Sequence, residues 1–301
     1  MSCTPAAPSS QQSEALLSES RPPVLRYAAF TAAGVGGNPA GIVFDAESLS
    51  DAAMQQIATD VDYAETAFIS GRDGAELSIR YFSPIAEVPF CGHATIATAV
   101  AMVERGLTAP GEVTFHTPVG DVVIQTTVAD SRVRASFTSV PPSVAKFPSK
   151  SLQRVLEAIG LTESDLDERM PPAIPNAGSP HPTIVIADRA VFDNFTFDPH
   201  VVRSLMDAEG WPATITVLHV PEAGEVWARN IFPVGRITED PATGSAAAAT
   251  GAYLRAFGLV SPPARITIHQ GEHVGRPSIL TVTIPPDGGI TVAGMASEIS
   301  E

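Results

Sequence analysis

F-C-G-H-A-T-I-A-T-A-V-A-M-V, from Phe90 to Val103, is the stretch of sequence that decides the fold. Its part from Ala94 to Val103 carries no charge and consists only of Ala, Thr, Ile, Val and Met. A helix that is apolar all round has to be buried on every side, and this segment is far too short to span a membrane. We therefore expect a buried helix with a β-sheet wrapped around it.

A second apolar segment, T-G-S-A-A-A-A-T-G-A-Y-L, follows from Thr243 to Leu254. The segments that surround the two helices also correspond. The matching pairs are Arg80 to Pro84 with Asn230 to Pro233, Gly92-His93-Ala94 with Gly244-Ser245-Ala246, and Thr114-Phe115-His116 with Thr267-Ile268-His269. Such a repeat predicts two similar domains related by a pseudo-twofold axis, with a ligand cleft between them. The alternative is a chance likeness between strand–loop–helix units.

Length and composition agree with two folded domains. The chain has 301 residues, of which 44% are hydrophobic and 17% charged, so it can form substantial cores. The formal net charge is −15 without a basic cluster, which argues against nucleic acid as a partner. The predicted division is a disordered N-terminal tail over residues 1–23, a first domain over 24–115 and a second over 116–287, with residues 288–301 available to return to the first domain.

The cysteine content and the composition of the N-terminus predict a cytoplasmic protein. The sequence has two cysteines, Cys3 and Cys91, and Cys3 lies in the expected tail, so we predict neither a structural disulfide nor a Cys-rich zinc site. Residues 1–22 lack the basic and apolar regions of a signal peptide. We expect no membrane partner.

The starts of the two apolar helices, at Gly92 and at Gly244-Ser245, are the expected binding elements. The first turn of a helix has unpaired N–H groups and a partial positive charge, and glycine lets a ligand approach the backbone closely. Two such helix starts facing one cleft would bind a carboxylate without a metal or a cofactor. The alternative is that these glycines are ordinary entries to buried helices.

Three side chains are candidates for acid/base chemistry. Glu65 lies among small and apolar residues of a predicted strand, and burial would raise its pKa toward neutrality. His93 begins the first helix, and its imidazole can hydrogen-bond a substrate hydroxyl or amine. Asp240 precedes the second helix and can orient His93 or a substrate amine. The structural alternatives are a solvated edge-strand glutamate, a packing histidine and a helix-capping aspartate.

Cys91 is a further candidate, because a helix N-terminus lowers the pKa of a thiol. It would serve as a nucleophile or as an acid/base, and the alternative is a small buried apolar residue. A racemase with two thiols needs a second cysteine before the other helix. The sequence there is Asp240-Pro241-Ala242, without a cysteine.

Five motifs, in order, resemble those of the PhzF-like (phenazine biosynthesis) isomerase family. They are G-N-P-A-G-I-V-F, A-E-T-A-F, F-S-P-I-A-E-V-P-F-C-G-H-A-T, E-D-P-A-T-G-S-A and Q-G-E-H-V-G-R-P-S, and they extend from about residue 24 to the end. The resemblance implies the α+β fold of diaminopimelate epimerase, with two pseudo-symmetric domains that each have a β-sheet wrapped around a central helix. It also makes a homodimer plausible.

The resemblance further implies a cofactor-free isomerase that moves a proton on a small carboxylate substrate, as in the family's reaction of trans-2,3-dihydro-3-hydroxyanthranilate. Glu65 matches the glutamate that moves the proton, and His93 and Asp240 match the residues that hold the substrate. Gly92, Gly244 and Ser245 match its binding residues. F-C-G-H also resembles the proline racemases, so the alternatives are an epimerase, racemase or dehydratase that uses Cys91, and a non-catalytic binding protein on the same scaffold.

Overall fold

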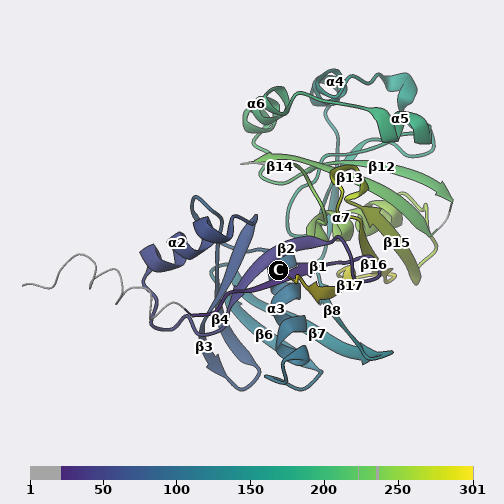
Figure 1. Cartoon of the computed structure of the whole chain (residues 1–301). Helices are drawn as coiled ribbons and strands as arrows, with labels where there is room; N and C mark the ends of the chain where they lie inside the picture. The colour runs from purple at the N-terminus through teal and green to yellow at the C-terminus, as the bar shows by residue number, and fades with distance from the viewer. Residues whose placement is uncertain (1–21, 223, 235–236, 301) are drawn as a thin grey trace, which may run out of the picture.

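The computed structural model describes residues 22–222, 224–234 and 237–300, which form two lobes (Figure 1). Residues 1–21 of the expected N-terminal tail lie outside the described residues. In Figure 1 the lobe with the purple and blue elements contains α3, and the lobe with the green and yellow elements contains α7. The end of the chain returns to the first of these lobes.

The first lobe is a closed ring of strands around α3, Gly92–Glu104. Neighbouring strands around the ring are β1 Leu25–Ala29, β2 Asn38–Val43, β3 Glu65–Asp73, β4 Glu76–Phe82, β6 Glu112–Thr117, β7 Gly120–Ala129, β8 Arg132–Thr138 and β17 Thr291–Glu298, which pairs again with β1. The short strand β5, Glu87–Val88, pairs with β4, and α2, Asp51–Val61, packs on β3 and β4.

The second lobe also has its strands wrapped around a central helix, α7, Gly244–Ala256. Its strands are β9 Ser143–Lys146, β10 Ala173–Asn176, β11 Thr183–Val185, β12 Ile215–Glu222, β13 Glu225–Val234, β14 Ile237–Asp240, β15 Ala264–Gln270 and β16 Ser278–Ile284. Three α-helices and two short 3₁₀ helices complete it: α4 Ser149–Ala158, α5 Arg189–Asn194, α6 Pro199–Glu209, η1 Glu163–Asp165 and η2 Glu272–Val274.

The strand directions confirm the internal repeat. Along β1–β2–β3–β4–β6–β7–β8 the successive pairings are antiparallel, parallel, antiparallel, parallel, antiparallel and antiparallel. The series β10–β11–β12–β13–β15–β16–β17 has the same directions in the same order. The predicted architecture, two pseudo-symmetric units that each wrap strands around an apolar helix, is therefore present.

Both central helices are as buried as their composition requires. Every residue of α3 from His93 to Met102 is buried, and in α7 every residue from Ala246 to Leu254 is buried. Gly251 of α7 shows how tight this packing is, because a Cβ there would lie 2.8 Å from Ile290 and 3.0 Å from Val282. Among the described residues, no helix is both long and apolar enough to cross a membrane.

Strand β17 belongs to both lobes. It pairs with β16 of the second lobe, and also with β8 and β1 of the first. The pairings place residues 120–138 and 291–298 in the ring around α3. We therefore propose a division of the chain near residue 140, in place of the division after residue 115.

Candidate active site

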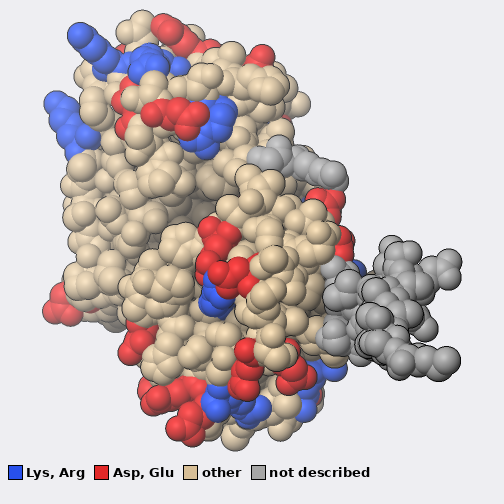
Figure 2. All heavy atoms as spheres, turned by 90° about the vertical axis from the view of Figure 1, so that its left-hand side faces the viewer, with Lys and Arg blue, Asp and Glu red and all other residues tan. Residues whose placement is uncertain are grey.

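A cleft of about 1080 Å³ lies where the two lobes meet, and residues of both lobes line it. On the face shown in Figure 2, charged side chains lie mainly over the two lobes, and the surface between them is largely uncharged. The cleft brings together all of the sequence-predicted site residues, which are Glu65, Cys91, Gly92, His93, Asp240, Gly244 and Ser245.

Both central helices begin at this cleft. The N-cap residues are Cys91 for α3 and Thr243 for α7, and neither caps its helix with its side chain. The N–H groups at the very start of each helix, at Gly92 and at Gly244, therefore face a ligand site. Among the described residues that line the cleft there is no Lys or Arg. The two helix starts contribute positive potential to the cleft.

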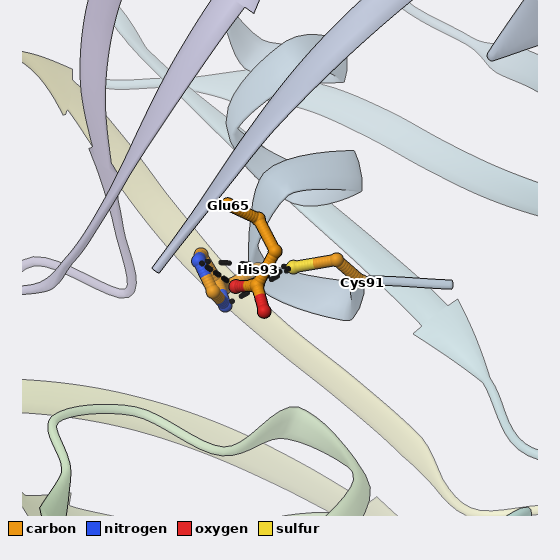
Figure 3. A group of neighbouring side chains, drawn as sticks. All are labelled: Glu65, Cys91 and His93. Atoms are coloured by element: carbon orange, nitrogen blue, oxygen red, sulfur yellow. Dashed lines mark hydrogen bonds and ion pairs between the residues drawn. The ribbon is translucent and has the colours of Figure 1, made fainter. Parts of the chain in front are cut away.

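Glu65 is the first residue of β3, and its side chain points into the cleft with 21% of its surface exposed. Its Oε2 lies 3.4 Å from Cys91 Sγ and 3.5 Å from His93 Nε2, and Figure 3 shows the three side chains pointing toward one another. Burial and the nearby charge of Asp240 raise the pKa of Glu65 to about 7, while the hydrogen bond from Cys91 opposes the rise. Glu65 is thus half-ionised near neutral pH.

His93 and Cys91 are held in their neutral forms. Burial lowers the pKa of His93 to about 4, so its imidazole is uncharged at pH 7. Burial and the charge of Glu65 raise the pKa of Cys91 well above its usual range, so this side chain is a thiol that donates to Glu65. The helix start that was expected to lower the pKa of this thiol is outweighed by desolvation.

Glu65, Cys91 and His93 each offer one donor atom, and these atoms lie within 4.8 Å of one another, which is close enough to hold a metal ion. The orientation of the imidazole fits a metal poorly. Cys91 Sγ lies 3.4 Å from His93 Nδ1 and 3.7 Å from Nε2, so it is nearly equidistant from both nitrogens. A ring nitrogen directs its lone pair away from the other nitrogen, and a metal shared with the thiol would therefore require the ring to turn.

Asp240, the last residue of β14, is held by two donors. Its Oδ1 accepts from Asn38 Nδ2 at 2.7 Å and its Oδ2 accepts from Thr243 Oγ1 at 2.6 Å. Burial raises the pKa of Asp240 to about 6, although both hydrogen bonds act in the opposite direction. Asn38 Nδ2 also lies 3.2 Å from His93 Nδ1, so the Asn38 amide lies between Asp240 and His93 and contacts both.

Four residues of the site were not predicted: Asn38, His181, Thr243 and Gln270. Gln270 Nε2 donates to the Asp240 carbonyl at 2.6 Å and to Thr243 Oγ1 at 3.0 Å. Asn38 and Gln270 stand in the motifs G-N-P-A and Q-G-E-H, so the sequence contained a signal for them. For His181, whose Nε2 lies 3.0 Å from Ser245 Oγ, there was none.

The comparisons with known proteins agree with this architecture. The family model described as phenazine biosynthesis-like protein matches residues 27–301. The uncharacterized isomerase YfhB of Bacillus subtilis (strain 168) is 30% identical over 272 residues, which cover 88% of this chain and 92% of that protein. Trans-2,3-dihydro-3-hydroxyanthranilate isomerase of Pseudomonas chlororaphis is 28% identical over 254 residues, which cover 84% of this chain and 86% of that protein.

A solved structure gives the same result. The PhzF-family phenazine biosynthesis protein of Bacillus anthracis superposes with a TM-score of 0.81 at 27% identity, over 92% of this chain and 96% of that one. The predicted diaminopimelate epimerase-like fold is confirmed. The chain therefore belongs to the phenazine biosynthesis-like protein family and is an isomerase.

Proposed function

We propose that the protein moves a proton on a small carboxylate-bearing substrate, with Glu65 as the general acid/base. The observation that carries this proposal is the Glu65 carboxyl group, which faces the cleft with a pKa of about 7. A group with this pKa can both accept and return a proton near neutral pH, which is the condition for efficient general acid/base catalysis.

In the proposed reaction the Glu65 carboxylate removes a proton from a carbon next to a double bond or a carbonyl group. The electron pair of the broken C–H bond enters the π system of the substrate. The protonated Glu65 then gives the proton to another carbon on the same face, which shifts the double bond and restores the carboxylate. The positive ends of α3 and α7 stabilise the negative charge that develops in between.

The binding roles follow from the positions of the remaining groups. The N–H groups at the starts of α3 and α7, near Gly92 and near Gly244-Ser245, bind the substrate carboxylate. The neutral imidazole of His93 and the carboxylate of Asp240 bind the polar substituents of the substrate. Both carboxylate oxygens of Asp240 already accept one hydrogen bond, and each has a further lone pair for a substrate hydroxyl or amine.

The geometry supports this reaction over the one that uses Cys91. A two-thiol racemase needs a cysteine at the start of both helices, and the residue of α7 that corresponds to Cys91 is Thr243. The raised pKa of Cys91 also leaves it a thiol rather than the thiolate that accepts a proton.

The test is hydrogen exchange in D₂O. The protein is incubated with a panel of small unsaturated carboxylates, and ¹H NMR follows the loss of carbon-bound protons. Trans-2,3-dihydro-3-hydroxyanthranilate, the compound in the name of the Pseudomonas chlororaphis relative, is the first member of the panel. We expect exchange and isomerisation of at least one compound. Binding of a compound without exchange or isomerisation would contradict the proposed proton transfer on that compound.

A further inference from the structure

His181 is a buried histidine that reaches the cleft from the second lobe. It is 0% exposed, and its imidazole lies between two hydroxyl groups, with Nδ1 2.9 Å from Thr214 Oγ1 and Nε2 3.0 Å from Ser245 Oγ. Its backbone is also fixed, because its N–H donates to the Pro175 carbonyl and its carbonyl accepts from Thr183. The two hydroxyl contacts and the complete burial hold the ring in place, and the remaining question is its tautomer.

The neighbouring residues determine this tautomer. Asn230 Oδ1 accepts from Thr214 Oγ1 at 2.8 Å and from Thr216 Oγ1 at 2.7 Å. A hydroxyl group has one hydrogen, so Thr214 can only accept from the imidazole, and Nδ1 of His181 carries the proton.

The second ring nitrogen then determines the direction of the hydrogen bond that the Ser245 hydroxyl makes. Burial lowers the pKa of His181 to about 4, so the ring is neutral at pH 7 and has a single N–H. Because that N–H is at Nδ1, Nε2 is an acceptor, and the Ser245 hydroxyl donates to it. Ser245 is half-buried and lines the cleft, so a ligand group that reaches its Oγ would meet lone pairs alone.

We propose that His181 is a positioning residue. Its Nε2 accepts the hydrogen of the Ser245 hydroxyl, so that Ser245 Oγ meets the substrate only as a hydrogen-bond acceptor. This inference rests on the proposed function, in which Ser245 binds substrate. It selects substrates that place a hydroxyl or amine hydrogen at Ser245 Oγ. An ether or a second carboxylate there would place two acceptors in contact with no hydrogen between them, which is unfavourable.

The first test reads the tautomer without any substrate. Protein labelled with ¹⁵N-histidine is studied by long-range ¹H–¹⁵N NMR at pH 7, and the His181 signals are assigned from their loss in the His181→Gln variant. We expect the pattern of a neutral ring protonated at Nδ1. A ring protonated at Nε2, or a charged ring, would overturn the proposal, and either result would leave the proposed role of Glu65 intact.

The second test is a double-mutant cycle on the KM measured by the exchange assay. If His181 acts through Ser245, His181→Phe and Ser245→Ala should each raise KM about tenfold, and the double variant should show no further rise. His181→Gln retains an acceptor for Ser245 and should keep KM within about threefold of the wild type. Independent, multiplying effects of the two substitutions on KM would contradict the proposal.

His219→Phe is the matched control for this cycle. His219 is also buried in the second lobe, where its Nδ1 bonds to the Ile186 carbonyl, and it does not line the cleft. We expect this variant to lose stability without a change in KM. A rise in KM equal to that of His181→Phe would show that loss of any buried histidine of this lobe disturbs the site.

Discussion

Asn38 Nδ2 donates to Asp240 Oδ1 at 2.7 Å, and this hydrogen bond joins the first residue of β2 to the last residue of β14. The same amide group donates to the Ala242 carbonyl at 3.1 Å and contacts His93 Nδ1 at 3.2 Å. An amide has two hydrogens, and the two shorter contacts go to the second lobe. Asn38, which lies beside His93 in the first lobe, therefore fixes the acidic side chain of the second lobe.

Removal of this donor should weaken the protein mainly above pH 6. In Asn38→Ala the buried Asp240 carboxylate loses one of its two donors, which should lower the free energy of unfolding at pH 8 by about 1–3 kcal/mol. At pH 4.5 Asp240 is protonated in the folded state, because its pKa is about 6, and the loss should be smaller. Urea unfolding at both pH values measures the difference. Asn194→Ala, at an exposed asparagine, is the control, and an equal loss at both pH values would contradict this explanation.

Glu65→Gln should stabilise the protein at high pH. The pKa of Glu65 is raised from 4.5 to about 7 on folding, so the stability that its protonated form contributes is present below pH 4.5 and is lost as the pH rises through 7. Glutamine stays neutral, and at pH 8 the variant should exceed the wild type by about 1–3 kcal/mol in free energy of unfolding. The two proteins should agree near pH 4. Glu168→Gln, at an exposed glutamate, is the control, and urea unfolding should show no such difference from the wild type at pH 8.

Cys91→Ala should keep the activity and shift its pH dependence. The thiol donates to Glu65 and lowers the pKa of that carboxyl, so its removal should move the limb of kcat/KM that rises with pH to a higher pH. At pH values above this limb, where kcat/KM no longer changes with pH, we expect kcat/KM within about threefold of the wild type. The reason is that a thiol with a raised pKa is not the base. A pH–rate profile measures both quantities. A loss of activity at every pH would show that Cys91 takes part in the reaction.

The two glycines at the helix starts should differ in their tolerance of a methyl group. A Cβ at Gly244 would lie 3.0 Å and 3.1 Å from ring atoms of Phe137 in the first lobe, whereas a Cβ at Gly92 would lie 3.8 Å or more from Phe90. Gly244→Ala should lower the free energy of unfolding by about 1–3 kcal/mol, and Gly92→Ala should change it by less than about 0.5 kcal/mol.

The variant Gly244→Ala with Phe137→Leu should regain part of the stability that Gly244→Ala loses. Thermal unfolding of the three variants is the measurement. Equal losses in Gly92→Ala and Gly244→Ala would show that the contact with Phe137 is not the cause.

The sequence predicted the elements whose signal is local. The apolar runs of α3 and α7 required complete burial, and their repetition predicted the symmetric cleft. Strand β17, T-V-A-G-M-A-S-E, was not predicted, because its buried positions include Gly294 and Ala296 rather than large apolar residues. Gly294 is small because the Phe30 ring lies against it, at 2.3 Å from where a Cβ would be. Such a contact joins distant parts of the chain and has no local pattern.

In the site, too, residues with a local sequence signal were predicted, and contacts between distant parts of the chain were not. Glu65 was recognisable as an acidic residue in an apolar strand, and Asp240 as an acidic residue before a buried helix. Their coupling through Asn38 depends on how the two lobes meet, which no local pattern specifies. His181 is 64 residues from Ser245 in the chain, and only the folded second lobe brings the two together.

The most direct test of the central claim, that Glu65 moves the proton, is the rate of deuterium incorporation into the substrate by Glu65→Gln in D₂O. Glutamine keeps the shape of the side chain and cannot accept the proton, so we expect the exchange rate to fall at least about 100-fold while the substrate still binds. An exchange rate equal to that of the wild type would contradict the role of Glu65.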